Sequence, residues 1–354
     1  MAAIEKILII GAGLSGLTLA YLIRQTHSSA AITVVEASGR LGGRIHTIKG
    51  LQDTPMELGA TWFSDQHPAL LQLSQQLDID KFPQYDTGKS LFQTKSFEPA
   101  QAFEVPATTT PSYRFKGGSE AIITALKNKL PENSVQLNTS IIEIQKTSDK
   151  LTAVSDTGQR FEADKICICL PPQVAAAHIK FPKEMPASIL DLLSEVQTWM
   201  AGSMKVVIEY DQPFWRSRGF SGMLYSHAGI ITEMYDHCTA KADKYALTGF
   251  LNGGSKTYNT QTRKKYALQQ LTELLGPAAA TPISFQDKIW DQPEVMATSG
   301  PQVFVEAHYN NGHPALQNAY LDNRLLFAGS ETATIHPGYM EGAVQAAIRA
   351  AKLL

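Results

Sequence analysis

The chain has 354 residues, a length at which a single hydrophobic core usually stops growing, so we expect two domains. Hydrophobic residues make up 44% of the sequence and charged residues 18%, which is typical of a folded globular protein and excludes a disordered chain. The 31 Lys and Arg residues nearly balance the 33 Asp and Glu residues, giving a net charge of -2. A sequence without a strongly basic surface is not expected to bind nucleic acid.

Membrane, export and metal-binding patterns are missing from the sequence. No apolar run approaches the roughly 20 residues of a membrane helix, and "KILIIGAG" has no charged region of a signal peptide before it. Three cysteines, Cys167, Cys169 and Cys238, make a poor disulfide framework and lack zinc spacing. We therefore expect a cytoplasmic protein with buried, reduced thiols, no membrane attachment and no bound metal.

The N-terminal residues predict a strand, a glycine turn, a helix and a second strand. Residues 4–10 and 31–37 are the strands, and "LTLAYLIRQ" has helical spacing between them. "GAGLSG" places Gly11, Gly13 and Gly16 at GxGxxG spacing directly after the first strand. The first glycine allows a tight turn, the second lets a pyrophosphate approach the backbone, and the third lets helix and strand pack closely. A parallel sheet with a dinucleotide site at the helix N-terminus follows.

Glu36 ends the second strand, 20 residues after Gly16. An acid at this place accepts a hydrogen bond from a ribose 2′-hydroxyl and disfavours a 2′-phosphate. At this point the residues leave two cofactors open, FAD and NAD.

Further elements follow in chain order. Residues 67–77 predict an amphipathic helix, whereas 83–113, rich in Pro, Thr, Ser and Gln, predict surface loops or a cap. A helix is expected between Ser119, its candidate N-cap, and Pro131. Segments with a period of two, "VQLNTSIIEIQKT", "KLTAVSDTG" and "ADKICICLPP", then predict a β-rich block.

The remaining elements mix helices and strands. Helices are expected at 188–198 and 263–275, and strands at 204–210 and 324–329. An Ala-rich helix ends the chain. Both ends of the chain have the pattern of a nucleotide-binding domain, so we expect a second domain built from insertions.

Several segments together resemble the flavin-containing amine oxidases, the monoamine oxidase family. "GRLGGRIHT" resembles the second glycine motif of the flavoproteins with two dinucleotide-binding domains, and "MELGATWF" resembles the segment that passes the flavin ring. Later matches are "FKGGSEAI", "NTSIIEI", "ADKICICLPP", "GSMKVVIEYDQPFW", "IWDQPEVMATSGP" and "FAGSETATIHPGYMEGAVQAAIRAA". The matches cover almost the whole chain, so the cofactor that the resemblance implies is FAD.

The resemblance implies an α/β fold. A Rossmann-like FAD-binding domain, a parallel sheet plus a β-meander, would comprise 1–64, 114–182 and 298–354. An α+β substrate domain formed by insertions would comprise 65–113 and 183–297.

The resemblance also implies a set of cofactor-binding residues beyond Gly11, Gly13, Gly16 and Glu36. Arg44 suits the pyrophosphate because its planar fork matches phosphate oxygens. The helix that starts at Gly338–Gly342 would turn free N–H groups to the flavin N1–C2=O edge, which favours reduction. The other implied residues are Gly43, Gly59, Ala60, Thr61, Ile141, Trp290, Gly329, Ser330, Glu331, Gly338 and Met340.

Lys205 and Tyr339 are the catalytic candidates. Lys205 matches the family lysine that holds a water near flavin N5, and Tyr339 matches a substrate-facing wall of the flavin site. Trp62 and His336 are further substrate-pocket candidates. The alternatives are an exposed strand lysine without a role for Lys205, a core aromatic for Trp62, and a capping or packing residue for His336.

The sequence departs from the family pattern at "TSGPQV", where many members carry a second cage aromatic and the membrane-bound enzymes a cysteine bonded to the flavin. FAD is therefore expected to bind non-covalently. Phe304, Tyr309 and His336 are the alternatives for the missing aromatic wall. The stretch between Trp62 and Gly117 is short, which predicts a trimmed substrate domain.

The function that follows is an FAD-dependent oxidase of a C–N bond in an amine or amino acid. Hydride transfer to flavin N5 would give an imine and then a carbonyl product, with O2 reduced to H2O2. The alternatives are a flavin desaturase or dehydrogenase of an apolar substrate, like the carotenoid and protoporphyrinogen branches, and a non-catalytic FAD-binding partner protein. The sequence leaves the oligomeric state open.

Overall fold

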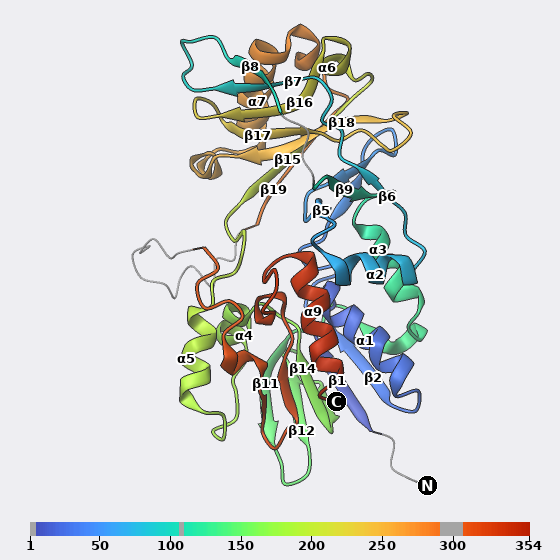
Figure 1. The fold of residues 1–354 in the computed structure, drawn as a ribbon. Helices are drawn as coiled ribbons and strands as arrows, with labels where there is room; N and C mark the ends of the chain where they lie inside the picture. The colour runs from blue at the N-terminus through green and yellow to red at the C-terminus, as the bar shows by residue number, and fades with distance from the viewer. Residues whose placement is uncertain (1–4, 106–109, 291–306) are drawn as a thin grey trace.

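The computed structural model describes residues 5–105, 110–290 and 307–354. Figure 1 shows two sheet-based parts, one at each end of the molecule. A six-stranded sheet lies in the lower part with both ends of the chain, and a seven-stranded sheet lies in the upper part. Within the described residues, no helix combines the length and apolar character needed to cross a bilayer.

The six-stranded sheet is parallel except at one edge, where β20 runs antiparallel to β21. Its strands in spatial order are β10 (Val135–Gln136), β2 (Ala31–Val35), β1 (Lys6–Ile10), β14 (Lys165–Ile168), β21 (Leu325–Phe327) and β20 (Ala319–Tyr320). Both faces are covered, which explains why β1 and β14 are nearly continuous apolar runs. All six strands come from residues 1–64, 114–182 and 298–354, the ranges predicted for the FAD-binding domain, although the domain boundaries themselves stay a prediction.

Alternate residues of β1 build two separate cores. Ile7 and Ile9 pack into a core with the helices on one face, whereas Leu8 and Ile10 pack into a core on the other. The helices of the first core are α1 (Leu14–Thr26), α2 (Pro68–Gln76), α3 (Glu120–Asn128) and α9 (Met340–Ala351). The second core contains α4 (Pro172–His178), α5 (Ala187–Glu195) and the antiparallel meander β11 (Ile141–Lys146), β12 (Leu151–Ser155) and β13 (Arg160–Ala163). The predicted α/β class, with a parallel sheet and a meander, is confirmed.

The seven-stranded sheet has the order β19-β15-β18-β17-β16-β7-β8. Its strands are β19 (Ser284–Ile289), β15 (Met204–Tyr210), β18 (Tyr245–Leu251), β17 (Ile231–Asp236), β16 (Phe220–Ser226), β7 (Lys89–Gln93) and β8 (Gln101–Glu104). One face packs against α6 (Phe214–Ser217) and α7 (Thr260–Leu275). The predicted strand at 204–210 coincides with β15.

The prediction of surface loops or a cap for 83–113 is wrong for part of this segment. β7 pairs in parallel with β16, and β8 forms the edge of the sheet. Ser90, Leu91 and Gln93 of β7 are buried. The strand could not be recognised in the sequence because several of its buried residues are polar. The Ser90 and Ser221 hydroxyls lie 2.9 Å apart inside the sheet and form a hydrogen bond with each other.

Smaller elements connect the two large sheets. β5 (Phe63–Ser64), β9 (Ser112–Phe115) and β6 (Lys81–Pro83) form a three-stranded sheet, and β3 (Thr47–Lys49) pairs with β4 (Pro55–Glu57). The described 3₁₀ helices are η1 (Glu132–Ser134), η2 (Gly253–Thr257), η3 (Pro277–Ala280), η4 (Pro314–Gln317) and η5 (Ser330–Thr332).

Glu57 fastens the start of α3 to the β3–β4 hairpin. Its buried carboxylate accepts hydrogen bonds from the Thr47 hydroxyl at 3.0 Å and from the backbone N–H of Ser119. The helix begins at Glu120, as expected from a cap at Ser119, but the Ser119 side chain makes no capping hydrogen bond. A carboxylate distant in the sequence replaces the local cap.

Glu341 fixes the start of α2 in a similar way. No side chain of α2 caps its own N-terminus. Instead, the fully buried carboxylate of Glu341, in the first turn of α9, accepts from the backbone N–H groups of Ala69 at 3.2 Å and Leu70 at 2.8 Å. A negative charge also suits the positive end of the helix dipole. Glu341 therefore joins α2 to α9.

Replacing Glu341→Ala is expected to lower the free energy of unfolding by about 2 kcal/mol, because two backbone donors lose a charged acceptor inside the protein. Glu341→Gln keeps one acceptor oxygen and is expected to lose less. Urea unfolding measures both, provided that the slope with denaturant is unchanged. Equal midpoints for the wild type and Glu341→Ala would rule out this cap.

Candidate functional site

The N-terminal glycine turn has the geometry of an anion site. Gly11 has a φ of +104°, and a Cβ on Gly16 would lie 2.0 Å from the Gly11 carbonyl oxygen, so neither position accepts a side chain. Helix α1 has Gly13 as its N-cap, no side-chain cap and no acidic residue in its first turn. The first-turn N–H groups are therefore available to an anion such as a pyrophosphate.

Glu36 lies beside this turn, as the spacing predicted. Its Oε2 accepts from the Ala12 N–H at 2.9 Å, and its Oε1 accepts from the N–H and the hydroxyl of Ser38 at 3.0 and 2.8 Å. The backbone N–H of Thr139 donates to the Glu36 carbonyl at 2.9 Å, which brings the chain just before Ile141 to the same edge of the sheet. Thus Glu36 and the segment before Ile141, another predicted cofactor-binding residue, are neighbours.

The second glycine motif folds back onto the first. The Gly42 N–H donates to the Ala12 carbonyl at 2.9 Å, and a Cβ on Gly43, whose φ is +56°, would lie 3.3 Å from the Gly13 Cα. Arg40 holds this loop by donating to the carbonyls of Leu41 at 2.9 Å, Ile45 at 2.8 Å and Gly43. The two glycine motifs thus form one concave backbone surface, the glycine cradle, in which the glycines carry no side chains.

Arg44 joins this cradle to the C-terminal segment. Its guanidinium forms an ion pair with the fully buried Glu331 at 2.5 Å and donates to the Ser330 hydroxyl at 2.8 Å. A Cβ on Gly329 would lie 2.1 Å from the Leu170 carbonyl oxygen, so this segment packs closely on the loop after β14. Residues predicted as cofactor contacts from opposite ends of the chain therefore meet.

The start of α9 is a second helix N-terminus without a side-chain cap. Tyr339 is its N-cap and Met340 its first residue. Gly338 has a φ of +81°, and a Cβ there would lie 2.6 Å from the Trp199 Cβ. The start of α1 and the glycine cradle fit a pyrophosphate, and the start of α9 fits an electron-poor ring. A cofactor that carries both groups therefore suits this arrangement.

Lys205 is almost completely buried, which excludes the alternative of an exposed strand lysine. Its ammonium donates to the Gly59 carbonyl at 2.6 Å and to the Thr61 hydroxyl, and lies 4.8 Å from the centre of the Trp62 ring. Burial lowers the pKa of Lys205 to about 7, and the Glu57 carboxylate opposes this shift. Burial raises the pKa of Glu57.

Gly59 and Ala60 pass close to the second glycine motif. A Cβ on Gly59 would lie 2.3 Å from the Arg44 carbonyl oxygen, and the Ala60 N–H donates to that oxygen at 3.1 Å. Trp290 is linked to the same segment, because its indole N–H donates to the Leu58 carbonyl at 2.6 Å. The predicted flavin-side residues are thus connected through backbone contacts.

Trp62 is half-buried at the edge of this segment. Its ring meets that of Tyr235 edge-to-face at a centroid distance of 4.9 Å, and its indole N–H donates to Gln84 at 2.9 Å. The contact with Tyr235 on β17 joins the predicted flavin-side segment to the seven-stranded sheet.

Tyr339 has aromatic neighbours that the sequence patterns did not indicate. The ring of His308 stacks on it with centroids 5.7 Å apart, and Trp199 lies 5.7 Å away and stacks on His308 at 4.2 Å. His336, a predicted pocket residue, meets Tyr339 edge-to-face at 6.2 Å. Tyr309 is 47% exposed, and Phe304 lies outside the described residues.

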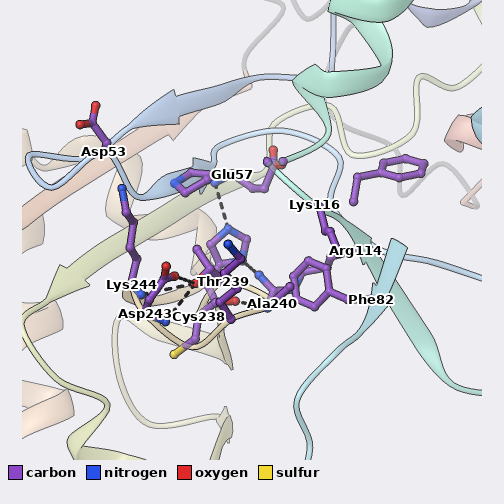
Figure 2. A pocket seen from close by; sticks show the side chains of 16 residues that line it. Asp53, Glu57, Phe82, Arg114, Lys116, Cys238, Thr239, Ala240, Asp243 and Lys244 are labelled. Carbon is purple, nitrogen blue, oxygen red and sulfur yellow. Dashed lines mark hydrogen bonds between the residues drawn. The ribbon is translucent and has the colours of Figure 1, made fainter. Parts of the chain in front are cut away.

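A cavity of about 260 Å³ lies elsewhere, and none of the predicted site residues lines it (Figure 2). Arg114, buried in its wall, donates to the Cys238 carbonyl at 2.6 Å, and burial lowers the pKa of this guanidinium to about 10. Its other terminal nitrogen lies 3.0 Å from Nδ1 of His237. Burial also lowers the pKa of His237.

The parallel sheet, the glycine cradle and the uncapped helices define a dinucleotide-binding protein of the flavoprotein class. The family model for flavin-containing amine oxidoreductases matches residues 14–108 and 95–354. The chain therefore belongs to the family of flavin-containing amine oxidoreductases and is an FAD-dependent oxidoreductase.

Known relatives cover the whole chain. Probable flavin-containing monoamine oxidase A of Dictyostelium discoideum is 23% identical, over 99% of this chain and 98% of that protein. Flavin-containing amine oxidase B of Sus scrofa is 22% identical, over 98% and 85%.

Two solved structures are similar in fold. Wild-type putrescine oxidase bound to putrescine has a TM-score of 0.81 at 18% identity, over 99% of this chain and 98% of that one. Cyclohexylamine oxidase from Brevibacterium oxydans has a TM-score of 0.82 at 20% identity, over 99% and 98%. At these identities the likeness shows a shared fold.

Replacing Arg44→Met is expected to lower the free energy of unfolding by about 3 kcal/mol, because it leaves the buried Glu331 carboxylate without its counter-charge. The double variant Arg44→Met/Glu331→Gln should recover part of this loss. Lys81→Met, which breaks the more exposed 2.9 Å pair with Asp65, is the control and should cost less than about 1 kcal/mol. Urea unfolding of samples with equal FAD content measures the three variants, and equal losses for Arg44→Met and Lys81→Met would contradict a buried pair.

Proposed function

We propose that this protein oxidises the C–N bond of an amine or amino acid, gives an imine that water converts to a carbonyl product, and uses O2 as the electron acceptor. When bound, FAD supplies the chemistry by accepting a hydride at N5 from the substrate carbon and passing the electrons to O2, which becomes H2O2. The family supports an amine substrate. Among the residues, the buried Lys205 carries the proposal.

Lys205 is suited to place a positive charge inside the protein. Its ammonium is directed at the Gly59–Thr61 segment by two hydrogen bonds and has aromatic rings on its other sides. We assign to it the holding of a water near flavin N5 and the stabilisation of negative charge that develops on O2. A cation at this place favours the oxidase over the alternative of a desaturase of an apolar substrate.

The other residues orient the cofactor and the amine. Glycines of the cradle and the start of α1 would hold the pyrophosphate, and Glu36 the ribose. The start of α9 would direct N–H groups at the flavin ring, where negative charge appears on reduction. Tyr339, with His308 and Trp199 behind it, would form one aromatic wall for the substrate, and Trp62 another. We also propose that the seven-stranded sheet belongs to the substrate domain.

Lys205→Met is expected to slow the reaction with O2 by about 100-fold, because an ammonium no longer faces the developing charge. Reduction of the flavin by an amine without oxygen should change far less. Stopped-flow absorbance measures the two half-reactions separately, with Lys265→Met, an exposed residue of α7, as the control. An unchanged rate of reaction with O2 would remove Lys205 from this step.

The reaction with O2 should also depend on pH. Because the pKa of Lys205 is lowered to about 7, the lysine is charged below this pH and neutral above it. The rate constant with O2 is expected to fall as pH rises through about 7 in the wild type and to lose this step in Lys205→Met. A step of equal size in both proteins would assign the titration to another group.

FAD is expected to leave the protein on acid precipitation, because no cysteine is available to bond to the flavin. Cys167 and Cys169 are buried in or next to β14, and Cys238 is buried after β17, with burial raising the pKa of all three thiols. The yellow colour should appear in the supernatant, measured by absorbance. Flavin that stays with the precipitate would show a covalent bond.

A further inference from the structure

The cavity of about 260 Å³ in Figure 2 has walls from several parts of the chain. Strand β4 and the turn before it form one wall, and residues 114–118, at the end of β9 and after it, form another. The connection between β17 and β18, residues 237–244, closes the cavity on a third side. The charged residues of the lining are the cations Arg114, Lys116, Lys241 and Lys244 and the acids Asp53, Glu57 and Asp243. What the cavity can bind depends on which of these groups already have partners.

Arg114 is a buried cation without a carboxylate partner. Only 5% of this residue is exposed, and its guanidinium lies 4.6 Å from the centre of the Phe82 ring. Among the described residues no carboxylate forms an ion pair with it, and the buried Asp236 on β17 pairs instead with Arg216 at 2.8 Å. With a pKa of about 10, Arg114 is charged at neutral pH. Because an unpaired charge inside a protein is costly, a counter-anion in the adjoining cavity would stabilise it.

The same wall has more hydrogen-bond donors than acceptors. Arg114 donates from one terminal nitrogen to the Cys238 carbonyl at 2.6 Å, whereas its buried Nε has no acceptor in the described part of the chain. Its other terminal nitrogen faces Nδ1 of His237 at 3.0 Å, and Nε2 of the same ring faces the backbone N–H of Glu57 at 3.3 Å. Burial lowers the pKa of His237, so the ring is neutral and accepts through one nitrogen only. One of these two donors is therefore left without an acceptor.

The more exposed part of the lining adds further donors. Lys241 makes no hydrogen bond or ion pair with any residue that the structure describes. The N–H of Gly117 has no acceptor within the same residues, and a Cβ at Gly117 would meet nothing within 4 Å, so the space beside it is open. Lys116 pairs with the exposed Asp80 at 2.9 Å, and Lys244 donates to a backbone carbonyl at 2.8 Å. Donors therefore surround the opening as well as the buried wall.

The acids of the lining do not neutralise Arg114. Glu57 already accepts hydrogen bonds from the β3–β4 hairpin and from the start of α3. Asp243 accepts from the Thr239 hydroxyl at 2.5 Å. Asp53 lies on the opposite side of the cavity from Arg114 in the view of Figure 2. The buried guanidinium is therefore left to a ligand.

We propose that this cavity binds a small oxyanion, a phosphate or carboxylate group, through the guanidinium of Arg114, with Lys241 and the Gly117 N–H as further donors. Ionised phosphate and carboxylate oxygens accept hydrogen bonds, and the planar guanidinium suits both groups. None of the residues predicted to bind the cofactor lines the cavity, and the proposal does not depend on the oxidation of amines. Glu57 lines the cavity and its charge also acts on Lys205, which links the site to the proposed reaction centre.

Isothermal titration calorimetry of the FAD-loaded protein with sodium phosphate tests the site, because bound FAD occupies the glycine cradle. Sodium chloride keeps the ionic strength constant, so that weak attraction to surface charges does not change during the titration. We expect saturable binding of a single phosphate per chain. Sodium acetate, titrated in the same way, separates the two groups: tighter binding of phosphate assigns a phosphate group, and tighter binding of acetate a carboxylate. No saturable binding of either anion would overturn the proposal.

Two variants of Ala240 test whether the anion lies in this cavity. Ala240 is an exposed residue of the lining, so its replacement disturbs no core. Ala240→Glu adds a negative charge and is expected to weaken phosphate binding by about 10-fold or more, because like charges repel at short distance. Ala240→Gln has the same size without the charge and should weaken binding by less than about 3-fold. Equal affinities of these two variants would contradict the site.

Variants of Arg114 test the buried cation itself. Arg114→Met is expected to weaken phosphate binding by about 100-fold, and Arg114→Lys, which keeps the charge and loses the planar fork, by about 10-fold. Lys265→Met, an exposed residue of α7, is the control and should bind as the wild type does. Flavin absorbance shows whether each variant folds, and if those of Arg114 do not, the two Ala240 variants decide. A folded Arg114→Met protein with the phosphate affinity of the wild type would overturn the assignment.

Discussion

The ion pair between Arg44 and Glu331 holds the candidate site together. Its partners are 287 residues apart in the sequence. The carboxylate is fully buried, and the guanidinium belongs to the loop that folds over the first glycine turn. A buried carboxylate needs this counter-charge, because removal from water strongly disfavours an isolated charge. The pair therefore joins the second glycine motif to the segment after β21, so it links the shape of the glycine cradle to the six-stranded sheet.

Lys205 connects the seven-stranded sheet to the same centre. Its hydrogen bonds to Gly59 and Thr61 are made by the segment that follows the β3–β4 hairpin, and Glu57 at the end of that hairpin also anchors α3. The Lys205 ammonium lies near the ring of Trp62. Burial lowers the pKa of Lys205, and the negative charge of Glu57 opposes this shift. The position of the seven-stranded sheet and the protonation of Lys205 therefore depend on the same contacts.

Local patterns in the sequence predicted the elements that position the cofactor residues. The GxGxxG turn, strand β15 and helix α9 lie where spacing and periodicity put them, because backbone rules act within a few residues. Contacts between distant segments escaped prediction. Trp199 and His308 beside Tyr339 belong to no motif, and the caps of α2 and α3 come from Glu341 and Glu57 rather than from adjacent residues.

A single irregularity explains why the sequence could not predict on which face of the seven-stranded sheet Glu233 lies. Ile231 and Glu233 are two residues apart, so a regular strand would direct both side chains to one face. The register shifts between them: Ile231 is opposite Leu251 and is fully buried in the core, whereas Glu233 is opposite Phe250 and turns to the face of Lys205. A bulge of this kind redirects a side chain without any signature in composition. The carboxylate reaches the face of Lys205 only through that shift, so its placement is a property of the register rather than of any sequence motif.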